Sequence, residues 1–355
     1  MGYGMQESNT PRARLRPVSR VGFAILLILA GTAAFAQSDW IYAASADRYV
    51  AIDPRDGAIV GSGRLATADY DPAAGSGSSG VATPQIVPTP GGKYVFFVFA
   101  DDARAVVVDA ESHAPVWSVA LPAGTQTIGF SSMGETILAY TGGTNWTELP
   151  HRQGRITGTG RAAPSLGAGT IAFNRRATRV YGNRGNDLVF ALTASGDAVA
   201  TVRVDGGPYD WHISPNFRFL VGVSERRLAL VDETRGQAVG YLDGGFTGGV
   251  FHPSSRQFYA LTTAGAAIVV AETGRMREQA RIEPPFLLEA IFREDDGTLH
   301  GLSQSAPFGA GAPVILTDIT GEQGIVEFPS GFADPGAGVS ATVVTLRPGG
   351  GFACF

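Results

Sequence analysis

The sequence predicts an all-β fold, a seven-bladed β-propeller of four-stranded blades. Three observations carry this prediction: a strand-only repeat of roughly 40 residues, middle strands that are apolar at successive positions, and chain ends that each supply part of one blade. One blade leaves both of its faces apolar, so such a repeat is stable only when neighbouring blades cover those faces.

The repeat is clearest in residues 40–59 and 90–119, where apolar strands alternate with short turns. Residues 94–100 (YVFFVFA) and 105–108 (AVVV) are apolar without alternation. Continuous apolarity indicates strands buried on both faces, and the short length and the β-branched and aromatic content argue against a buried helix. These segments are the expected middle strands, packed between two neighbouring blades.

A short turn follows the first strand of each repeat and allows the blades to be counted. The turns fall near residues 91, 134, 176, 216, 254, 296 and 349, spaced by 43, 42, 40, 38, 42 and 53 residues. The corresponding first strands are 85–87, 127–130, 170–173, 210–213, 249–251, 289–292 and 341–346. The sequence therefore predicts seven blades.

The two chain ends are expected to complete one blade. Residues 41–44 form a second strand with no first strand before it, whereas residues 339–346 (VSATVVTL) form a first strand with almost nothing after it. Pairing these segments closes the ring and removes the exposed edges of an open sheet. The expected domain spans residues 37–355.

Residues 1–36 have the three parts of a secretory signal peptide. Four arginines precede the apolar run 21–36, which ends on Ala34-Phe35-Ala36. The run is shorter than the roughly 20 apolar residues that span a bilayer. We expect cleavage after Ala36 and a periplasmic or secreted protein without a membrane span, in line with the Arg-, Ala- and Gly-rich composition of a GC-rich bacterial genome. An uncleaved N-terminal anchor is the alternative.

Charge and cysteine content exclude several classes of partner. Without the leader, the chain has 31 acidic and 23 basic residues, a net charge of −8, and Lys93 is its sole lysine. Such a surface repels phosphate backbones, so nucleic acid is excluded as a partner. Cys354 is the single cysteine and can form neither an internal disulfide nor a cysteine metal cluster.

The turn between the third and fourth strands repeats an acidic or hydroxyl residue followed by glycine, as in residues 53–57 (DPRDG), 232–236 (DETRG) and 272–274 (ETG). Asp and Thr side chains bond the turn backbone, and Gly supplies positive φ. We interpret these acidic residues as structural and expect none to be catalytic.

Residues 41–53 (IYAASADRYVAID), 90–95 (PGGKYV) and 213–216 (ISPN) together resemble the YVTN-type seven-bladed propeller repeat. That group includes the propeller chains of the quinoprotein amine dehydrogenases, in which the propeller is a non-catalytic subunit that holds a small quinone-bearing chain. The resemblance spans the expected domain and is best in blades 1, 2 and 5. It implies a propeller fold and a scaffold role without a cofactor of its own.

Two other propeller groups share parts of the pattern. Residues 108–117 resemble the pyrroloquinoline quinone repeat, but its docking tryptophan does not recur in the other blades. Lactonase-like propellers are enzymes, and their catalytic residues cannot be placed on positions of this sequence.

Connections of a propeller divide between two faces. First-to-second and third-to-fourth strand turns lie on one face, which we call the tight-turn face; the other connections lie on the insertion face. Long insertions are expected only on the insertion face, at 66–80, 141–153, 303–313 and 328–338. Loops on a rigid scaffold carry binding, and the candidate residues are Asp69, Tyr70, Asp71, Trp146, His151, Arg152, Tyr209, Asp210, Trp211, His212, Phe308 and Phe332.

Residues 209–212 (YDWH) rank first in this set because they begin an innermost strand at the expected channel mouth. Aromatic residues among polar ones suit a protein interface or a sugar-like ligand. For Trp146 and Trp211 the alternative is a hydrophobic plug that anchors its own loop.

Known catalytic motifs are absent from the sequence, and of the five histidines only His212 and His252 fall on innermost strands of adjacent blades. We therefore expect no metal site. The leading hypothesis is an exported, non-enzymatic binding or scaffold protein that takes a partner protein or small ligand on the insertion face, with a subunit of a periplasmic redox complex as its extension. The alternative is a propeller hydrolase or lactonase acting around Asp210 and His212.

Overall fold

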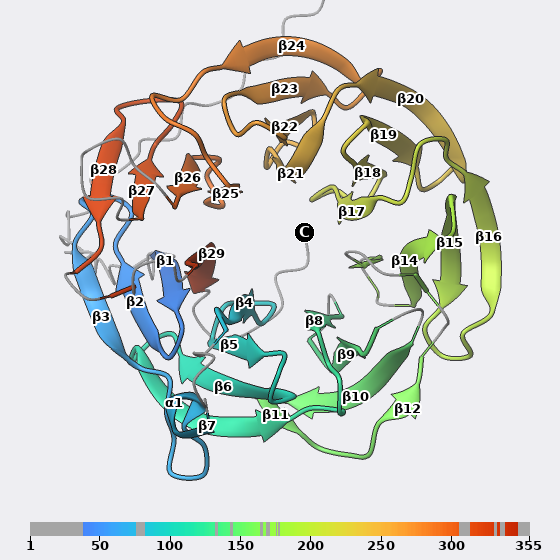
Figure 1. Ribbon diagram of the computed structural model, residues 1–355. Coiled ribbons are helices and arrows are strands. Elements are labelled where there is room, and N and C mark those ends of the chain that lie inside the picture. Colours follow the sequence, from blue (N-terminus) through green and yellow to red (C-terminus); the bar gives the residue numbers. More distant parts are fainter. Residues whose placement is uncertain are drawn as a thin grey trace, which may run out of the picture. The chain divides into compact units, whose positions relative to one another are not determined.

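Seven antiparallel sheets form the blades of a ring in the computed structural model (Figure 1). The structure describes residues 38–75, 82–131, 134–142, 145–163, 166–167, 171–174, 176, 178–304, 313–329, 332–333 and 338–346. The sequence prediction of an all-β, seven-bladed propeller is confirmed. One four-residue helix, α1 (Pro72–Gly75), lies in a connection, and the described residues contain no helix long and apolar enough to cross a membrane.

Blade 1 contains both ends of the described chain. Its strands follow the order β29 (Ser340–Leu346), β1 (Ser38–Ser45), β2 (Arg48–Ile52) and β3 (Ile59–Arg64). Strand β29 pairs with β1 from Ser38↔Leu346 to Ala44↔Ser340, so the C-terminal strand closes the ring as the sequence predicts.

Blades 2 to 4 follow in sequence around the ring. Blade 2 comprises β4 (Gln85–Pro88), β5 (Tyr94–Phe99), β6 (Arg104–Asp109) and β7 (Ala114–Ala120). Blade 3 comprises β8 (Thr127–Phe130), β9 (Thr136–Tyr140), β10 (Trp146–Arg152) and β11 (Arg155–Ile156), and β12 (Arg161–Ala162) also pairs with β10. Blade 4 comprises β13 (Ala172–Phe173), β14 (Arg179–Arg184), β15 (Asp187–Leu192) and β16 (Ala198–Arg203).

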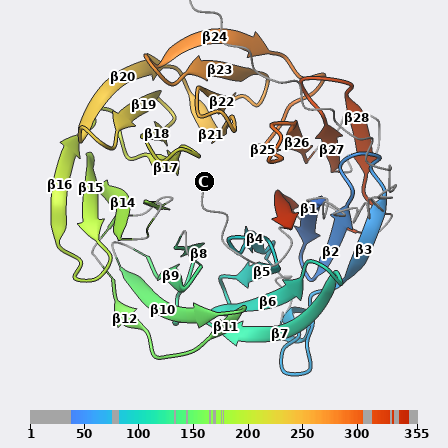
Figure 2. The ribbon, with the colours of Figure 1, turned by 180° about the vertical axis from the view of Figure 1, so that it is seen from behind.

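Blades 5 to 7 complete the ring. Blade 5 comprises β17 (Asp210–Ile213), β18 (Phe219–Val223), β19 (Arg227–Asp232) and β20 (Gln237–Asp243). Blade 6 comprises β21 (Phe246–Phe251), β22 (Gln257–Thr262), β23 (Ile268–Glu272) and β24 (Arg277–Ile282). Blade 7 comprises β25 (Ala290–Arg293), β26 (Leu299–Ser303), β27 (Val314–Thr317) and β28 (Gly324–Glu327). Figure 2 shows the same order from behind.

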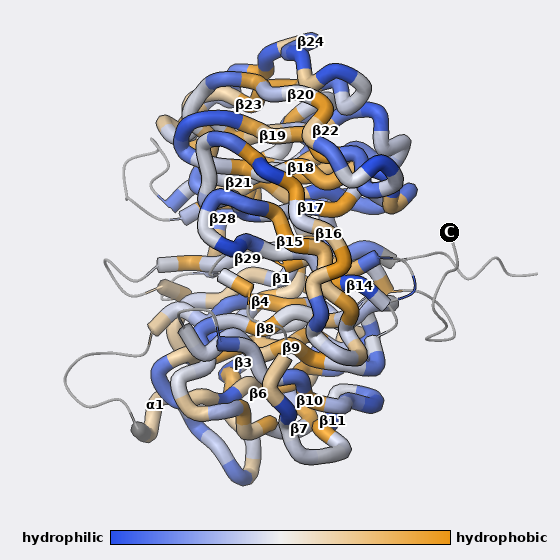
Figure 3. Tube along the Cα trace, turned by 90° about the vertical axis from the view of Figure 1, so that its right-hand side faces the viewer, coloured by the Kyte–Doolittle hydropathy of each residue, from blue (hydrophilic) through white to orange (hydrophobic). Residues whose placement is uncertain are grey.

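Middle strands are buried on both faces because each blade packs between two others. Strand β5 has five consecutive buried residues, and β19 has five as well. The outermost strands β3 and β24 are exposed along nearly their whole length. In Figure 3 the hydrophobic colour accordingly follows middle strands such as β18 and β22, while the turns are hydrophilic.

Turns between third and fourth strands fasten each blade to the one before it. His113, at φ 52°, lies in the turn of blade 2 and packs on Gly61 of β3, where a Cβ would stand 2.5 Å from the His113 Cβ. In blade 3 the Gly154 carbonyl accepts a hydrogen bond from the Trp117 indole of blade 2 (2.8 Å). The expected structural role of the turn acids agrees with Asp53 and Asp232, whose carboxylates accept hydrogen bonds from the backbone N–H groups of Arg55 and Arg235 (3.0 Å each).

Candidate functional site

The three longest connections on the insertion face gather in three adjacent blades, whereas a nine-residue connection, 163–171, joins blades 3 and 4. Residues 65–84 join blades 1 and 2, residues 304–313 lie within blade 7, and residues 328–339 join blade 7 to β29 of blade 1. The predicted fourth insertion at 141–153 was wrong, because residues 146–152 form strand β10 and leave only 141–145 as a loop. The insertions therefore occupy one sector of the face.

Hydrogen bonds connect the roots of these three insertions. The Gln304 side chain donates to the Val339 carbonyl and accepts from the Val339 N–H (2.9 Å), while the Gln304 N–H donates to Glu289 (2.8 Å). Thr83 donates to the Gly338 carbonyl (2.8 Å), and Ser340 donates to the Pro84 carbonyl (2.6 Å). The sector is thus held in place by side-chain-to-backbone bonds between segments up to 256 residues apart.

Tyr70, one of the predicted residues, packs on blade 2 beside the first insertion. Its hydroxyl donates to Asp102 (2.5 Å), its ring meets Phe99 edge-on, and the Arg104 guanidinium lies 5.3 Å from its centroid. Burial, together with the neighbouring Asp102 carboxylate, raises the pKa of Tyr70 and keeps the hydroxyl protonated.

Asp69 and Asp71 flank this tyrosine and are exposed or half-buried. Asp69 accepts hydrogen bonds from Ser118 (2.6 Å) and Thr67 (2.7 Å), which lower the pKa of its carboxyl. Asp71 accepts from the Ala73 N–H (3.0 Å) and pairs with Arg64 (3.4 Å). These three predicted residues do lie together, and their polar groups hold the first insertion against blades 1 and 2.

The Tyr209–Trp211 segment, ranked first in the sequence, is mainly core. Trp211 is 1% exposed and Tyr209 is 2% exposed. Asn183 of β14 joins them, because its side-chain oxygen accepts from the Trp211 indole (2.8 Å) and its nitrogen donates to the Tyr209 carbonyl (2.5 Å). The plug interpretation of Trp211 is therefore the one that the structure supports.

Asp210 and His212 point away from that core, towards blade 6. The His212 ring lies 5.6 Å from the ring of Phe258 in β22, and Asp210 is exposed. Burial lowers the pKa of His212, and the nearby Asp210 carboxylate opposes this effect. The imidazole is therefore neutral at pH 7.

Three of the remaining predicted residues are displaced from the expected surface. Trp146 is buried, and its ring centroid lies 4.8 Å from that of Tyr140, with the two rings tilted by 39°. His151 and Arg152 end β10 on the tight-turn face, opposite to the prediction, because β10 runs through the segment that had been assigned to a loop. His151 is buried there, and Arg152 is exposed.

Phe332 belongs to the third insertion but is buried, and it stacks on Phe328 (4.8 Å, 20°). Phe308 lies outside the described residues.

The residue that sequence reasoning missed is Leu287, in the connection between β24 and β25. Its side chain is 56% exposed, and it precedes Glu289, the acceptor of the Gln304 N–H, by two positions. Its signal was the apolar tripeptide in residues 286–288, directly after two prolines.

Metal-binding side chains do not converge anywhere in the described part of the chain, where no group of three or more His, Cys, Asp or Glu could hold an ion. His252, the second candidate ligand of the sequence, bonds Ser254 (2.8 Å) within its own turn.

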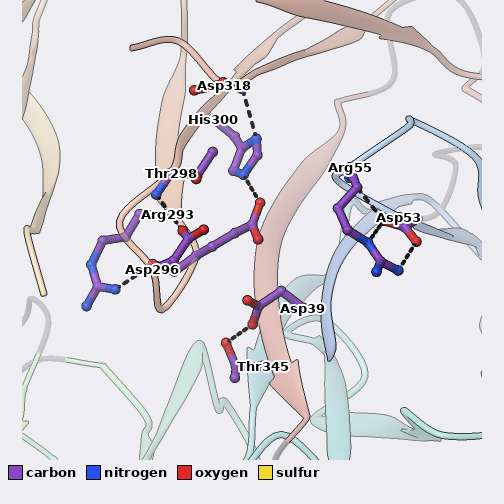
Figure 4. A network of polar contacts seen from close by, with 10 residues as sticks. Asp39, Asp53, Arg55, Arg293, Asp296, Thr298, His300, Asp318 and Thr345 are labelled. Atoms are coloured by element: carbon purple, nitrogen blue, oxygen red, sulfur yellow. Dashed lines mark hydrogen bonds and ion pairs between the residues drawn. The ribbon is translucent and has the colours of Figure 1, made fainter. Parts of the chain in front are cut away.

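A polar network on the tight-turn face was also missed (Figure 4). Asp39 accepts a hydrogen bond from Thr345 of the closing strand, and burial together with Glu294, Asp295 and Asp296 raises its pKa. Arg293 donates to the Phe251 and Glu294 carbonyls, and burial lowers its pKa. The residues come from the turns of blades 1, 6 and 7, which no sequence spacing brings together.

Fold and face together define a seven-bladed propeller that carries long connections on one sector of one face. No protein-family model matches the chain, and no curated protein sequence matches it. Solved structures are similar at the level of the fold.

Three propellers of known structure illustrate this similarity. The Cps50 (Swd1) β-propeller domain of Myceliophteria thermophila is 11% identical, with a TM-score of 0.61 over 80% of this chain and 93% of that one. The dihydro-heme d1 dehydrogenase NirN, in complex with DHE, is 13% identical, with a TM-score of 0.56 over 82% and 74%. Hydrazine synthase of Kuenenia stuttgartiensis is 14% identical, with a TM-score of 0.52 over 70% and 80%. Each likeness concerns the fold.

Proposed function

We propose that this chain is an exported, non-enzymatic propeller that binds a partner protein through the sector of the insertion face formed by blades 7, 1 and 2. The observation that carries the proposal is the set of hydrogen bonds linking the roots of the three insertions at Gln304, Thr83 and Ser340. Loop roots that are already fixed lose less conformational entropy on binding, which favours recognition by such a sector.

Exposed apolar surface lies at the edge of the same sector. Leu287 is the most exposed large apolar side chain in the described part of the chain. An exposed leucine beside polar connections whose roots are linked by hydrogen bonds matches the apolar centre and polar rim of protein interfaces. Asp69 and Asp71 of the first insertion are polar residues of the same sector.

The partner in this proposal is a subunit of a periplasmic redox complex. Support comes from the resemblance to the propeller chains of amine dehydrogenases and from the fold likeness to propellers of hydrazine synthase and a heme d1 dehydrogenase. The similarity to the Swd1 propeller shows that the fold by itself does not select this partner. Export rests on residues 1–36, which lie outside the described residues.

The enzymatic alternative has weaker support. A hydrolase requires a nucleophile or bound water held by a base and an oriented partner. Trp211 and Tyr209 are turned into the core, and the His212 ring packs at a tilt against Phe258. The geometry around residues 209–212 thus favours packing over catalysis.

Photo-crosslinking separates the two functions. A crosslinking amino acid at Leu287 should trap one defined protein in cells of the native host, whereas the same residue at Val199, an exposed apolar position on β16, should not. Equal trapping at both positions would overturn the proposal. So would turnover of a lactone or ester that is lost in His212→Ala while Leu287 traps nothing.

A further inference from the structure

The tight-turn face, which the proposed function does not use, is built of short turns and is divided by charge. Its first-to-second strand connections in blades 2 to 7 are all five residues long, at 89–93, 131–135, 174–178, 214–218, 252–256 and 294–298. The third-to-fourth connections are no longer than six residues. No insertion of the described chain projects from this face, on which both described ends, Ser38 and Leu346, also lie.

Opposite charges occupy opposite halves of this face. The face comprises the described turn residues, the two strand residues on either side of each turn, and the ends of β1 and β29 that meet there. Blades 7, 1 and 2 contribute ten acidic and three basic residues, a net charge of −7, and form the acidic half. Blades 3 to 6 contribute nine basic and six acidic residues, a net charge of +3, and form the basic half. Blade 1 lies across the ring from blades 4 and 5, so the two halves face each other across the central axis (Figure 1).

Each half also holds exposed charges without an ion pair among the described residues. In the acidic half these are Asp56, Glu111, Asp296 and Glu322, with Lys93 as the one basic charge among them. In the basic half they are Arg152, Arg155, Arg176, Arg256 and Arg275, with the acidic Glu135 and Asp197. Other charges on this face are already neutralised locally, as Arg218 and Arg235 are beside the buried Asp232. The uncompensated charges are therefore available to an incoming surface.

We propose that the tight-turn face docks onto the same face of a second copy of this chain. A two-fold axis that lies in the plane of the face, along the boundary between the halves, places each acidic half against the basic half of the other copy. Such an isologous contact is formed twice, so every complementary pair counts twice. The arrangement leaves both insertion faces directed outward and independent of the contact.

Charge reversal tests this pairing. In one variant Arg256→Glu and Arg275→Glu reverse the basic half; in the other Asp296→Arg and Glu322→Arg reverse the acidic half. Sedimentation equilibrium of the mature chain should show dimers at about 0.01 M ionic strength, where the screening length is about 30 Å, and monomers at about 1 M. Each variant should dimerise at least about 100-fold more weakly, because like charges then meet twice.

An equimolar mixture of the two variants is the decisive sample. The reversed half of each variant now complements the reversed half of the other, so the mixture should associate while each variant alone does not. Arg226→Glu, an exposed charge on the insertion face, is the matched control and should leave dimerisation unchanged. A wild-type chain that is monomeric at low salt, a dimer insensitive to both reversals, or a mixture that fails to associate would each overturn the proposal.

Discussion

At the scale of single residues, buried histidines connect turns on the tight-turn face. The Gly154 N–H donates to Nε2 of His151 (2.8 Å), which leaves Nδ1–H to donate to the Gly134 carbonyl (2.7 Å). In blade 7 the His300 Nε2–H donates to the buried Glu294 carboxylate (2.7 Å). Each histidine holds the first-to-second turn of its own blade.

Protonation of His151 should destabilise the fold. Burial lowers the pKa of His151, although its bond to Gly134 opposes the effect, so the native state binds a proton less readily than the unfolded chain, whose histidines titrate near 6.5. The stabilisation is complete above pH 6.5 and is lost as the pH falls below it, by at most about 1.4 kcal/mol per pH unit.

Urea denaturation between pH 7.5 and 5.5 measures this loss. His151→Gln, which cannot charge, should show a flatter dependence than wild type. Burial also lowers the pKa of His113, His212 and His252, so the variant should keep part of the slope. An unchanged slope would contradict the assignment to His151.

Asn183 should be a second residue of large effect. Asn183→Ala removes the partners of the Trp211 indole and of the Tyr209 carbonyl, and an unsatisfied buried polar group costs about 1–3 kcal/mol. We expect a loss of about 2–4 kcal/mol in unfolding free energy by urea titration. Asn186→Ala, in the exposed turn that follows β14, should change stability by less than about 0.5 kcal/mol.

At the scale of elements, ring closure depends on close approach between the first turn of blade 2 and the closing strand β29. A Cβ on Gly92 would stand 1.8 Å from the Thr345 carbonyl oxygen, whereas a Cβ on Gly91 would meet nothing within 4 Å. Both glycines have positive φ, at 72° and 89°. A comparison of substitutions at Gly91 and Gly92 therefore distinguishes the cost of a left-handed backbone from the cost of a clash with β29.

Substitution of these two glycines should give unequal losses. Gly91→Ala should lower the unfolding free energy by only about 1–2 kcal/mol, the cost of a left-handed backbone at a residue that has a Cβ. Gly92→Ala should cost clearly more and should raise amide exchange in β29, because the turn and the strand must move apart. Equal losses in thermal melts, with unchanged exchange, would show that the closing strand does not depend on this contact.

At the scale of the whole molecule, the predicted leader can be tested separately from the propeller. The described propeller begins at Ser38, which would be the second residue of the processed chain. Intact-mass measurement of the purified protein from its host should give a chain that starts at Gln37. Ala36→Leu should block processing, since the residue before the cleavage point must be small, and should leave a longer, membrane-associated chain. Wild-type protein retaining residues 1–36 would favour the uncleaved anchor.

Most of the fold could be predicted from local pattern. Two predicted first strands, 127–130 and 210–213, have the observed bounds. The failure at 141–153 has a physical cause: β10 contains Glu148, Pro150 and His151. Polar residues and proline are typical of loops, and only pairing with β9 and β12 shows that this segment is a strand.

The candidate site could be predicted only in part, because successive side chains of a strand point to opposite faces. Trp211 packs into the core shared with blade 4, while His212 meets Phe258 of blade 6, and the sequence shows both only as neighbours. The hydrogen bonds that join Gln304 to Val339 and Ser340 to Pro84 could not be predicted from the sequence either, because they connect loops of different blades.

The sequence by itself determined the number of blades, the strand that closes the ring and the structural role of the turn acids, because these depend on apolar periodicity and on turn chemistry within one repeat. Only the tertiary structure decided which aromatic residues are buried, which insertions meet, and how charge divides between the halves of the tight-turn face. Those properties arise between blades, where the ring brings together residues that are distant along the chain.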